Sequence, residues 1–508
     1  MGETRLASEA AEKDDSPQSF NFDATPIDLS TFTFSTIAET AELPLQTDQP
    51  ISKRISMQRL LFALSLMLTA SLALAAEAPK PNIVLIVADD LGYADLSCQG
   101  LSKDVSTPNI DALASAGVRF TNGYVSGPVC SPTRAGLMTG RYQQRFGHDH
   151  NPDGSGRETI GLPLEQTTLA DVLKKQGYVT GLFGKWHLGH SEKYVPQKRG
   201  FDEFFGFLSG AHSYLRHNDT ILRGTEVVDE KEYLTDAFTR EAVSFIDRHH
   251  DKPFFLYLPY NAVHTPLDKT PEKYLKGTEG IEDPKRKSFV AMLNALDAGV
   301  GQVMETLKKH GLDNEKTMVI FFSDNGGPTA GNTSINTPLS GFKGGVREGG
   351  VRVASMIKWD KHIPAGKVED APMIQLDYFT TIAMAVGAGE QIKDLKLDGV
   401  DLLPFLMGKG EKPHQSLFWR FGTPWAVRDG DMKLFDMNDG KGVQLIDLSK
   451  DIAEANNLAD AQPEEVKRLQ DLYAEWNKQN IEPLWRQRKA AAKRQGGRNN
   501  QKAPNAAE

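Results

Sequence analysis

The sequence predicts an α/β protein built on a mainly parallel sheet. The 508-residue chain contains several short apolar runs, such as residues 83–87, in which no polar residue alternates with the apolar ones. Such runs are typical of strands that are buried on both faces, as they are in parallel sheets. Amphipathic stretches with helical periodicity separate the runs. That alternation favours parallel strands joined by crossover helices.

The elements of the main domain follow in order from the first strand, which we expect within "PNIVLIVADD" (81–90). A helix is expected at 107–117, because Thr107 suits the N-cap, Pro108 the first helical position and Gly117 the stop. Further strands are expected within 178–189, 252–266 and 316–327, and further helices within 164–177, 287–309 and 375–387. Segment 397–408 is expected to close this domain.

The pattern changes near residue 411. Short strands separated by Gly and Asp turns are followed by an amphipathic helix at 463–477. We therefore predict a main domain at 79–410 and a small C-terminal α+β subdomain at 411–486. Residues 487–508 are basic and poor in apolar side chains, so we expect a disordered tail.

The N-terminal part contains a segment of the secretory type. "MQRLLFALSLMLTASLALA" (57–75) has an early Arg59, an apolar core and a small-x-small end, which predicts a signal peptide. An uncleaved anchor is the alternative, although the core is short for a span of ~20 residues. Residues 1–56 are polar and are interpreted as a non-native or disordered upstream extension. The expected location is periplasmic or secreted, without stable membrane insertion after cleavage.

Composition narrows the possible partners. The net charge of −9 and the pI near 5.8 argue against nucleic acid as a partner. An acidic protein that handles an anion must gather its cations locally. With two cysteines no disulfide framework can form, and one Cys98–Cys130 bridge is the simple alternative to a functional role for either residue.

The stretch "VCSPTRAGLMTG" (129–140) places Cys130 at the start of an expected helix. Pro132 suits the first turn of that helix, where its missing N–H costs little. Unpaired N–H groups and the positive end of the helix dipole gather at such a position. It therefore suits an anion, or a nucleophile that attacks an anionic substrate.

Polar residues follow the ends of four expected strands, which meet at one edge of a parallel sheet. Asp89, Asp90, Asp324 and Asn325 are hard oxygen donors, so the sequence predicts a Ca²⁺ or Mg²⁺ site and not a zinc site. A single aspartate there would equally suit a helix cap or a turn. We expect five cationic or proton-carrying side chains at the same edge: Arg134, Lys185, His187, His264 and Lys343. Taken singly, each lysine or arginine would be a surface charge and each histidine a hydrogen-bonded core residue.

These residues carry a resemblance to the sulfatase family. Residues 130–134 fit its C-x-P-x-R signature, and the resemblance continues through "GKWHLGH" (184–190), "HTP" (264–266), "SDNGG" (323–327) and "GFKGGVREGGVRV" (341–353). The resemblance covers about residues 80 to 450. It implies an alkaline-phosphatase-like α/β/α sandwich, with 79–410 as the catalytic domain of a sulfuric ester hydrolase.

The resemblance also implies roles for individual residues. Cys130 would be oxidised by a separate formylglycine-generating enzyme to Cα-formylglycine, whose hydrate attacks sulfur. His187 would help to eliminate sulfate, and His264 would be the general acid. Arg134 and Lys185 would contact formylglycine and the sulfate. His264 and Lys343 would lie on the side of the sulfate and the leaving group. The calcium ligands that the resemblance implies are Asp89, Asp90, Cys130, Asp324 and Asn325.

The expected substrate is a sulfated carbohydrate, either a polysaccharide or a glycosaminoglycan fragment. The contexts "HLGH" and "GVREGGVRV" resemble carbohydrate sulfatases of the N-acetylgalactosamine-6-sulfatase kind more than small aryl-ester enzymes. Segment 200–219 is interpreted as a loop over the pocket. Its polar side chains would contact sugar hydroxyls or a second anionic group of the substrate: His212, Tyr214, Arg216 and His217. Two alternatives remain: a phosphonate or phosphate monoester hydrolase on the same scaffold, and a non-catalytic protein that binds sulfated glycans.

Overall fold

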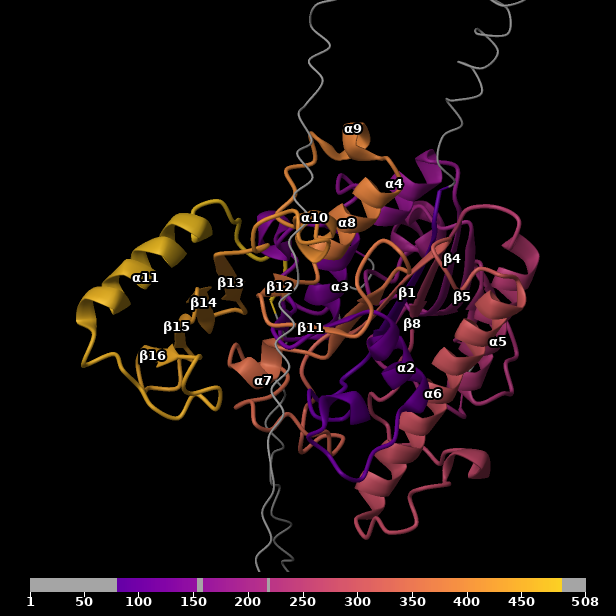
Figure 1. Cartoon of the computed structure of the whole chain (residues 1–508), viewed down its shortest axis with the longest axis horizontal. Helices are drawn as coiled ribbons and strands as arrows, with labels where there is room; N and C mark the ends of the chain where they lie inside the picture. The colour runs from indigo at the N-terminus through magenta and orange to yellow at the C-terminus, as the bar shows by residue number, and fades with distance from the viewer. Residues whose placement is uncertain (1–79, 153–158, 217–219, 487–508) are drawn as a thin grey trace, which may run out of the picture. The chain divides into compact units, whose positions relative to one another are not determined.

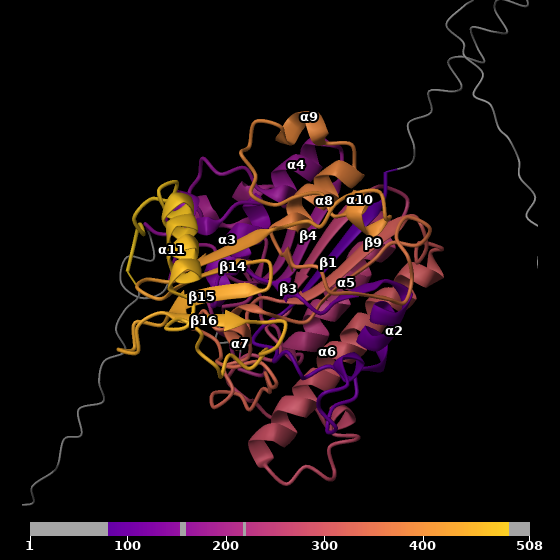
Figure 2. The same ribbon diagram turned by 60° about the vertical axis from the view of Figure 1, so that its left-hand side comes forward.

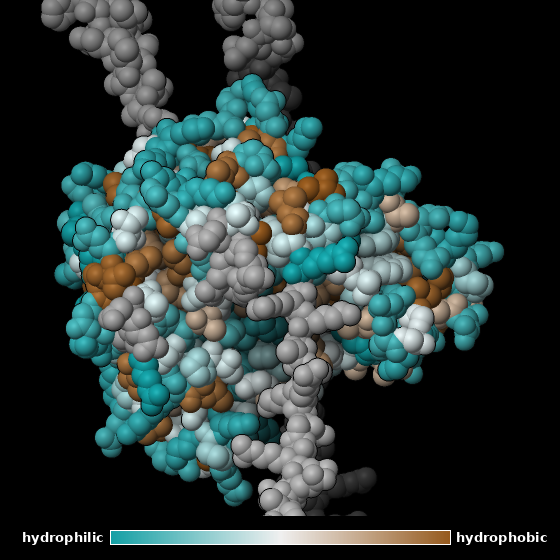
Figure 3. Space-filling model, turned by 180° about the vertical axis from the view of Figure 1, so that it is seen from behind, coloured by the Kyte–Doolittle hydropathy of each residue, from teal (hydrophilic) through white to brown (hydrophobic). Residues whose placement is uncertain are grey.

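The computed structural model describes residues 80–152, 159–216 and 220–486, all of which belong to one compact unit. The predicted upstream extension (1–56), signal peptide (57–75), basic tail (487–508) and His217 lie outside the described residues. Within the described ranges, no helix combines the length and the apolar character needed to cross a membrane. On the face seen in Figure 3, exposed side chains are mainly hydrophilic and hydrophobic ones form small separate groups.

A ten-stranded sheet forms the centre of the molecule, in the order β11-β2-β10-β9-β1-β8-β4-β5-β6-β7. Strands β9, β1, β8, β4 and β5 are mutually parallel, while β10 runs antiparallel to both of its neighbours. The predicted α/β class with a mainly parallel sheet is therefore confirmed. The strands are β1 (Asn82–Ala88), β2 (Val118–Phe120), β4 (Val179–Lys185), β5 (Glu203–Phe207), β6 (Leu222–Arg223), β7 (Glu226–Val227), β8 (Phe254–Pro259), β9 (Thr317–Ser323), β10 (Ser355–Lys358) and β11 (Lys367–Glu369).

Helices cover both faces of this sheet, because successive residues of a strand point to opposite sides. Val84 and Ile86 of β1 pack in one core with α2 (Pro108–Ala116), α5 (Leu234–His249) and α6 (Pro284–Lys309). Ile83, Leu85 and Val87 pack in a second core on the other face. The helices of that core are α3 (Cys130–Thr139), α4 (Leu169–Lys175) and α8 (Asp377–Ala385), and Figures 1 and 2 show the two helical layers on either side of the strands.

A second, antiparallel sheet forms the C-terminal subdomain. Its strands β13 (Ser416–Arg420), β14 (Trp425–Asp429), β15 (Met432–Asp436) and β16 (Gln444–Asp447) pair in sequence order. Helix α11 (Pro463–Asn477) covers one face, as Figure 2 shows, by packing Leu469 on Val427 and Leu434. On the other face, the Trp419 indole donates to the Val125 carbonyl over 2.7 Å. This sheet confirms the predicted small α+β subdomain.

Short elements connect the two sheets. Strands β3 (Gly123–Tyr124) and β12 (Met373–Ile374) form a parallel pair. The Tyr124 ring lies 5.3 Å from the Trp419 ring, between centroids, so β3 contacts the C-terminal sheet. The remaining α-helices are short: α7 (Glu348–Val351), α9 (Gly389–Ile392) and α10 (Leu403–Leu406).

The helix expected within 164–177 is present as the shorter α4, because Thr168 and Asp171 form a reciprocal capping box that starts the helix at residue 169. Three other local expectations were wrong. Segment 200–219 is not a loop throughout, since it begins with the buried strand β5. The Thr107 hydroxyl does not cap α2 but bonds to the side chains of Ser97 and Asp111. Cys98 and Cys130 are both free, so the alternative of a bridge between them is wrong.

Candidate active site

The parallel strands β1 and β9 place their following acidic residues side by side. Ala88 pairs in register with Ser323, so Asp89 and Asp90 leave the sheet next to Asp324 and Asn325. All four side chains are buried. Asp90 has a φ of 62°, in the left-handed region that side-chain-bearing residues seldom adopt, and its N–H donates to Asp324 Oδ1 over 3.4 Å. Backbone strain of this kind gathers at functional sites.

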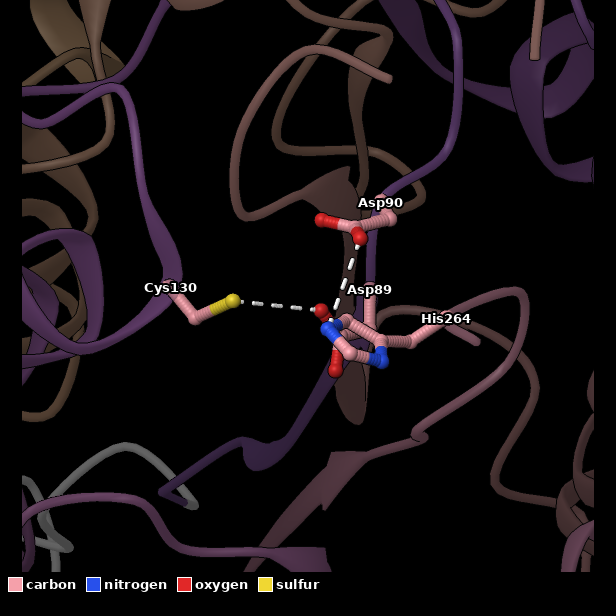
Figure 4. A group of neighbouring side chains, drawn as sticks. All are labelled: Asp89, Asp90, Cys130 and His264. Carbon is pink, nitrogen blue, oxygen red and sulfur yellow. Dashed lines mark hydrogen bonds and ion pairs between the residues drawn. The ribbon is translucent and has the colours of Figure 1, made fainter. Parts of the chain in front are cut away.

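Cys130 is the first residue of α3, after an extended Val129, as the sequence predicts. Its Sγ lies 3.4 Å from Asp89 Oδ1 and 3.4 Å from Lys343 Nζ, and Figure 4 shows it pointing at the Asp89 carboxylate. The side chain is 1% exposed. Burial, and then the negative charge of Asp89, raise the pKa of the thiol to about 12. The sulfur is therefore a neutral thiol in this environment and not a thiolate nucleophile.

Two fully buried cations brace the carboxylates. Lys185, the last residue of β4, places Nζ 2.6 Å from Asp89 Oδ2. Arg134, one turn into α3, donates to Asp324 Oδ2 from Nε over 3.0 Å and from a terminal nitrogen over 2.8 Å. Its other terminal nitrogen donates to the Lys185 carbonyl over 3.0 Å. Arg134 therefore ties together the ends of β9 and β4.

The neighbouring cations keep the Asp89 carboxyl ionised. Burial alone would raise the pKa of this carboxyl, but the charge of Lys185, followed by those of His264 and Arg134, outweighs the burial and holds the pKa well below its usual range. Asp324 behaves differently, since burial and the like charge of Asp89 raise its pKa. Carboxylates crowded in this way would be stabilised by a bound cation.

His264 and Lys343 occupy the open side of the cluster. Their side chains are 15% and 17% exposed, whereas that of Asp90 is 2% exposed. Lys343 Nζ lies 2.6 Å from Asp90 Oδ1, and His264 Nε2 lies 3.5 Å from Asp90 Oδ2. His264 Nδ1 lies 2.5 Å from the carbonyl oxygen of Thr265, which accepts a hydrogen bond from the protonated Nδ1. Nε2 is then the ring nitrogen that faces the site.

The residues present fit a hard divalent cation. One ligand atom from each of Asp89, Asp90, Cys130 and His264 lies within 4.8 Å of all the others, and Figure 4 shows these side chains converging. Asn325 Oδ1 is buried and has no hydrogen-bond partner among the described residues, while its Nδ2 donates to Asp90 Oδ1 over 2.7 Å. An orphaned buried oxygen beside carboxylates suits Ca²⁺ or Mg²⁺.

The clustered group differs from the predicted ligand set. The imidazole of His264 belongs to it, whereas Asp324 lies outside it, with its Oδ2 bound by Arg134. The sequence reveals that both residues follow strands, but not which side chains converge at one point.

The main chain of His187 contacts Ser131, the residue after Cys130. His187 has a φ of 58° and a buried side chain, and its carbonyl accepts a 2.6 Å hydrogen bond from the hydroxyl of Ser131. The same hydroxyl lies 2.7 Å from His148 Nε2. Sequence reasoning missed both Ser131 and His148, although Ser131 lies inside the C-x-P-x-R signature.

Of the residues predicted to contact the substrate, those of segment 200–219 lie outside the cluster of potential metal ligands. His212 and Arg216 line a cavity of about 560 Å³ together with Phe207, which pairs in register with Lys185 at the end of β5. Tyr214 is fully buried, and its hydroxyl contacts the carbonyl oxygens of Asn261 and His264 over 2.5 and 2.9 Å. The expectation that Tyr214 contacts the substrate is therefore wrong. The Tyr214 side chain instead links this loop to the segment that carries His264.

The sandwich of helices around the sheet, with acidic residues, cations and a buried cysteine at one edge, is the alkaline-phosphatase-like fold of the enzymes that hydrolyse anionic esters. The chain belongs to the sulfatase family, because the Sulfatase family model matches residues 81–388. It is therefore a sulfuric ester hydrolase.

Known proteins support this assignment over most of the chain. Human arylsulfatase A is 34% identical, with 80% of this chain and 90% of that protein covered. Mouse N-acetylgalactosamine-6-sulfatase is 34% identical, with 73% and 75% covered. The crystal structure of Ps i-CgsB in complex with k-i-k-neocarrahexaose is 36% identical, with a TM-score of 0.74 and with 80% and 94% covered.

Proposed function

We propose that this sulfatase removes sulfate from a sulfated carbohydrate, using a Cα-formylglycine made from Cys130 and a bound calcium ion. The observation that carries the proposal is the position of Cys130, which is buried at the start of α3 between Asp89 and Lys343. The carbohydrate substrate is supported by the names of two relatives, an N-acetylgalactosamine-6-sulfatase and a protein bound to a neocarrahexaose.

The surroundings of Cys130 explain why the thiol itself would be a poor nucleophile. The carboxylate of Asp89 faces Sγ at 3.4 Å and disfavours a second negative charge there. A formylglycine hydrate at residue 130 would supply one hydroxyl as the nucleophile toward sulfur and a second hydroxyl whose deprotonation would allow sulfate to leave. A formylglycine-generating enzyme is accordingly the proposed maturation partner.

The chain's own residues would stabilise the transferring group and protonate the leaving group. Lys185 and Lys343 place ammonium groups where they would offset charge on the nonbridging sulfate oxygens. His264, partly exposed with Nε2 facing the site, would protonate the departing sugar oxygen, which leaves poorly as an alkoxide. His187 is proposed to assist the release of sulfate.

The proposed calcium ligands are Asp89, Asp90, Cys130, Asp324 and Asn325, and Mg²⁺ could substitute. When bound, the ion would lower the pKa of the attacking hydroxyl and polarise a sulfate oxygen. Arg134 would keep Asp324 oriented, since it binds one oxygen of that carboxylate and leaves Oδ1 facing Asp90.

The cavity that contains His212 and Arg216 is proposed to hold the sugar units next to the sulfated one. It lies beyond β5, whose last residue Phe207 neighbours Lys185, and Tyr214 links its loop to His264. The proposed location of the enzyme is periplasmic or secreted, based on segment 57–75. N-terminal sequencing of the native protein tests this: a mature start inside residues 1–56 would contradict it.

Mass mapping of the peptide that contains residue 130, in protein from its own host, tests the central proposal. We expect an aldehyde at residue 130, turnover of sulfated oligosaccharides, and no turnover by Cys130→Ala. A matched pair of sulfate and phosphate esters of one alcohol separates a sulfatase from the alternative phosphatase or phosphonate hydrolase. An intact thiol accompanied by full turnover overturns the formylglycine, and an intact thiol with glycan binding alone favours the non-catalytic alternative.

A further inference from the structure

A buried ion cluster joins the C-terminal sheet to the catalytic domain. Lys433 of β15 places Nζ 2.7 Å from Glu348 Oε1 and 3.0 Å from Glu454 Oε1. Glu348 begins α7, and Glu454 follows β16. These three residues form the Lys433 cluster, and the side chain of each is 0% exposed. The ion pairs between these buried charges hold their geometry, because separating them would leave a charge without compensation.

The Lys433 cluster fixes the loop that leads from β9 to α7. Glu454 Oε2 accepts a hydrogen bond from the Ser340 hydroxyl and another, over 2.9 Å, from the N–H of Glu348. The Ser340 carbonyl in turn accepts from the N–H of Gly349 over 2.6 Å. One carboxylate oxygen of the C-terminal subdomain therefore holds both ends of residues 340–348.

Arg347 adds a second attachment to the same sheet. One of its terminal nitrogens lies 3.1 Å from Gln444 Oε1 of β16, and its guanidinium lies 5.0 Å from the ring centroid of Phe435 in β15. The loop end next to α7 is thus held by two neighbouring strands of the C-terminal sheet.

Lys343 lies at the tip of a tight turn inside this segment. The N–H of Gly345 donates to the Phe342 carbonyl over 3.1 Å, and Gly344 has a φ of 88°, which glycine adopts without steric cost. The N–H of Gly344 also donates to the carbonyl of Pro128, just before Cys130, over 2.8 Å. The turn therefore determines how far the Lys343 ammonium reaches toward Asp90 and Cys130.

We propose that Glu454 is a positioning residue for Lys343, so that the C-terminal subdomain sets the geometry of the active site. The proposal rests on the proposed role of Lys343 at the sulfate. A shift of about 1 Å in a group that acts on the transition state can cost ~10²-fold in rate. We therefore expect Glu454→Ala to lower kcat by ~10- to 100-fold, with KM changed by less than about threefold because the substrate contacts remain.

A double-mutant cycle on the formylglycine-containing enzyme, assayed with a small aryl sulfate, tests the proposal. Lys343→Ala alone should lower kcat by ~10²–10³-fold, the usual loss for one donor aimed at developing charge. Adding Glu454→Ala to Lys343→Ala should lower kcat by less than about twofold further, because a misplaced lysine matters only when the lysine is present. A merely structural role for Glu454 would give the same fold-loss in both backgrounds.

Two further variants keep the test decisive. Ser340→Ala removes only the hydroxyl that Glu454 binds, so it should lower kcat by about 3- to 10-fold and lose that effect in the Lys343→Ala background, even where Glu454→Ala fails to fold. Glu241→Ala is the matched control, since Glu241 is a buried carboxylate of α5 paired with Arg223 over 2.7 Å. It should reduce stability and leave kcat unchanged.

The outcomes separate the two proposals. A Lys343→Ala enzyme of normal kcat overturns the proposed role of Lys343. A slow Lys343→Ala enzyme in which the losses from Glu454→Ala or Ser340→Ala remain in full overturns the positioning role of Glu454 and leaves the function of Lys343 standing.

Discussion

Replacement of Lys185 by methionine tests whether the buried cations serve both stability and catalysis. Lys185 and Asp89 are each 0% exposed and lie 2.6 Å apart, so Lys185→Met leaves a buried carboxylate without its nearest charge. Removing one partner of such a pair costs about 3–5 kcal/mol. Arg134 remains 3.8 Å from Asp89 Oδ2 and compensates in part, so we expect about 3 kcal/mol, at the lower end of that range.

The free energy of unfolding in urea measures this loss, with calcium at saturation and with a chelator present. We expect a smaller loss with calcium, because a bound cation would replace part of the missing charge. Lys174→Met is the matched control, since Lys174 is 50% exposed and pairs with Asp202 over 2.5 Å. An exposed pair contributes about 0–1 kcal/mol.

Steady-state kinetics on an aryl sulfate give the second measurement. The kcat of Lys185→Met should fall by ~10²–10³-fold, as for the loss of one preorganised donor in a dry site. A folded Lys185→Met enzyme whose stability lies within about 1 kcal/mol of the parent, below the range for a broken buried pair, and whose kcat is unchanged would refute the reasoning for both roles.

Three further predictions follow from the site and its surroundings. His264→Ala should lower kcat on sugar sulfates by ~10²–10⁴-fold. It should lower kcat on aryl sulfates much less, because a phenolate leaves without being protonated. Equal losses in kcat on both substrates would contradict the general-acid role. Chelation should abolish turnover and lower the melting temperature, with both restored by calcium, whose binding adds about 2.7 kcal/mol at 100 times Kd; a melting curve that is insensitive to calcium would speak against the metal site. His414 lies 2.8 Å from Asp377. Burial alone would lower the pKa of His414, but the charge of Asp377 outweighs burial and raises the pKa above its ordinary value. This pair therefore stabilises the fold fully below the unfolded pKa of about 6.5 and progressively less as the pH rises through the folded pKa, so urea unfolding should show a decline there that His414→Gln lacks.

Much of the site was predictable because the ends of parallel strands share one edge of a sheet. That rule brings together Asp89, Asp324 and Lys185, and the structure links the three through Arg134. The rule says nothing about side-chain direction. For that reason the sequence did not reveal that His264 would join the group of potential metal ligands or that Tyr214 would turn inward.

The missed elements have local causes. Glycine and aromatic residues in "GFDEFFGFLSG" suggested a loop, yet Phe204, Phe205 and Phe207 are buried between the two helical layers as part of β5. The Lys433 cluster was beyond local reasoning for a different reason. Its bonds to Glu348 span 85 and 106 residues of sequence, and each member alone resembles an ordinary surface charge.

The burial of Cys130 has a consequence for how the active protein is made. With 1% of its surface accessible, the sulfur is out of reach of another macromolecule once α3 has packed on the sheet. The proposed oxidation of Cys130 by a separate enzyme would therefore have to precede folding. A host that lacks that enzyme should accumulate a stable protein that binds calcium but has no sulfatase activity. Treating the folded protein with that enzyme afterwards should not restore activity.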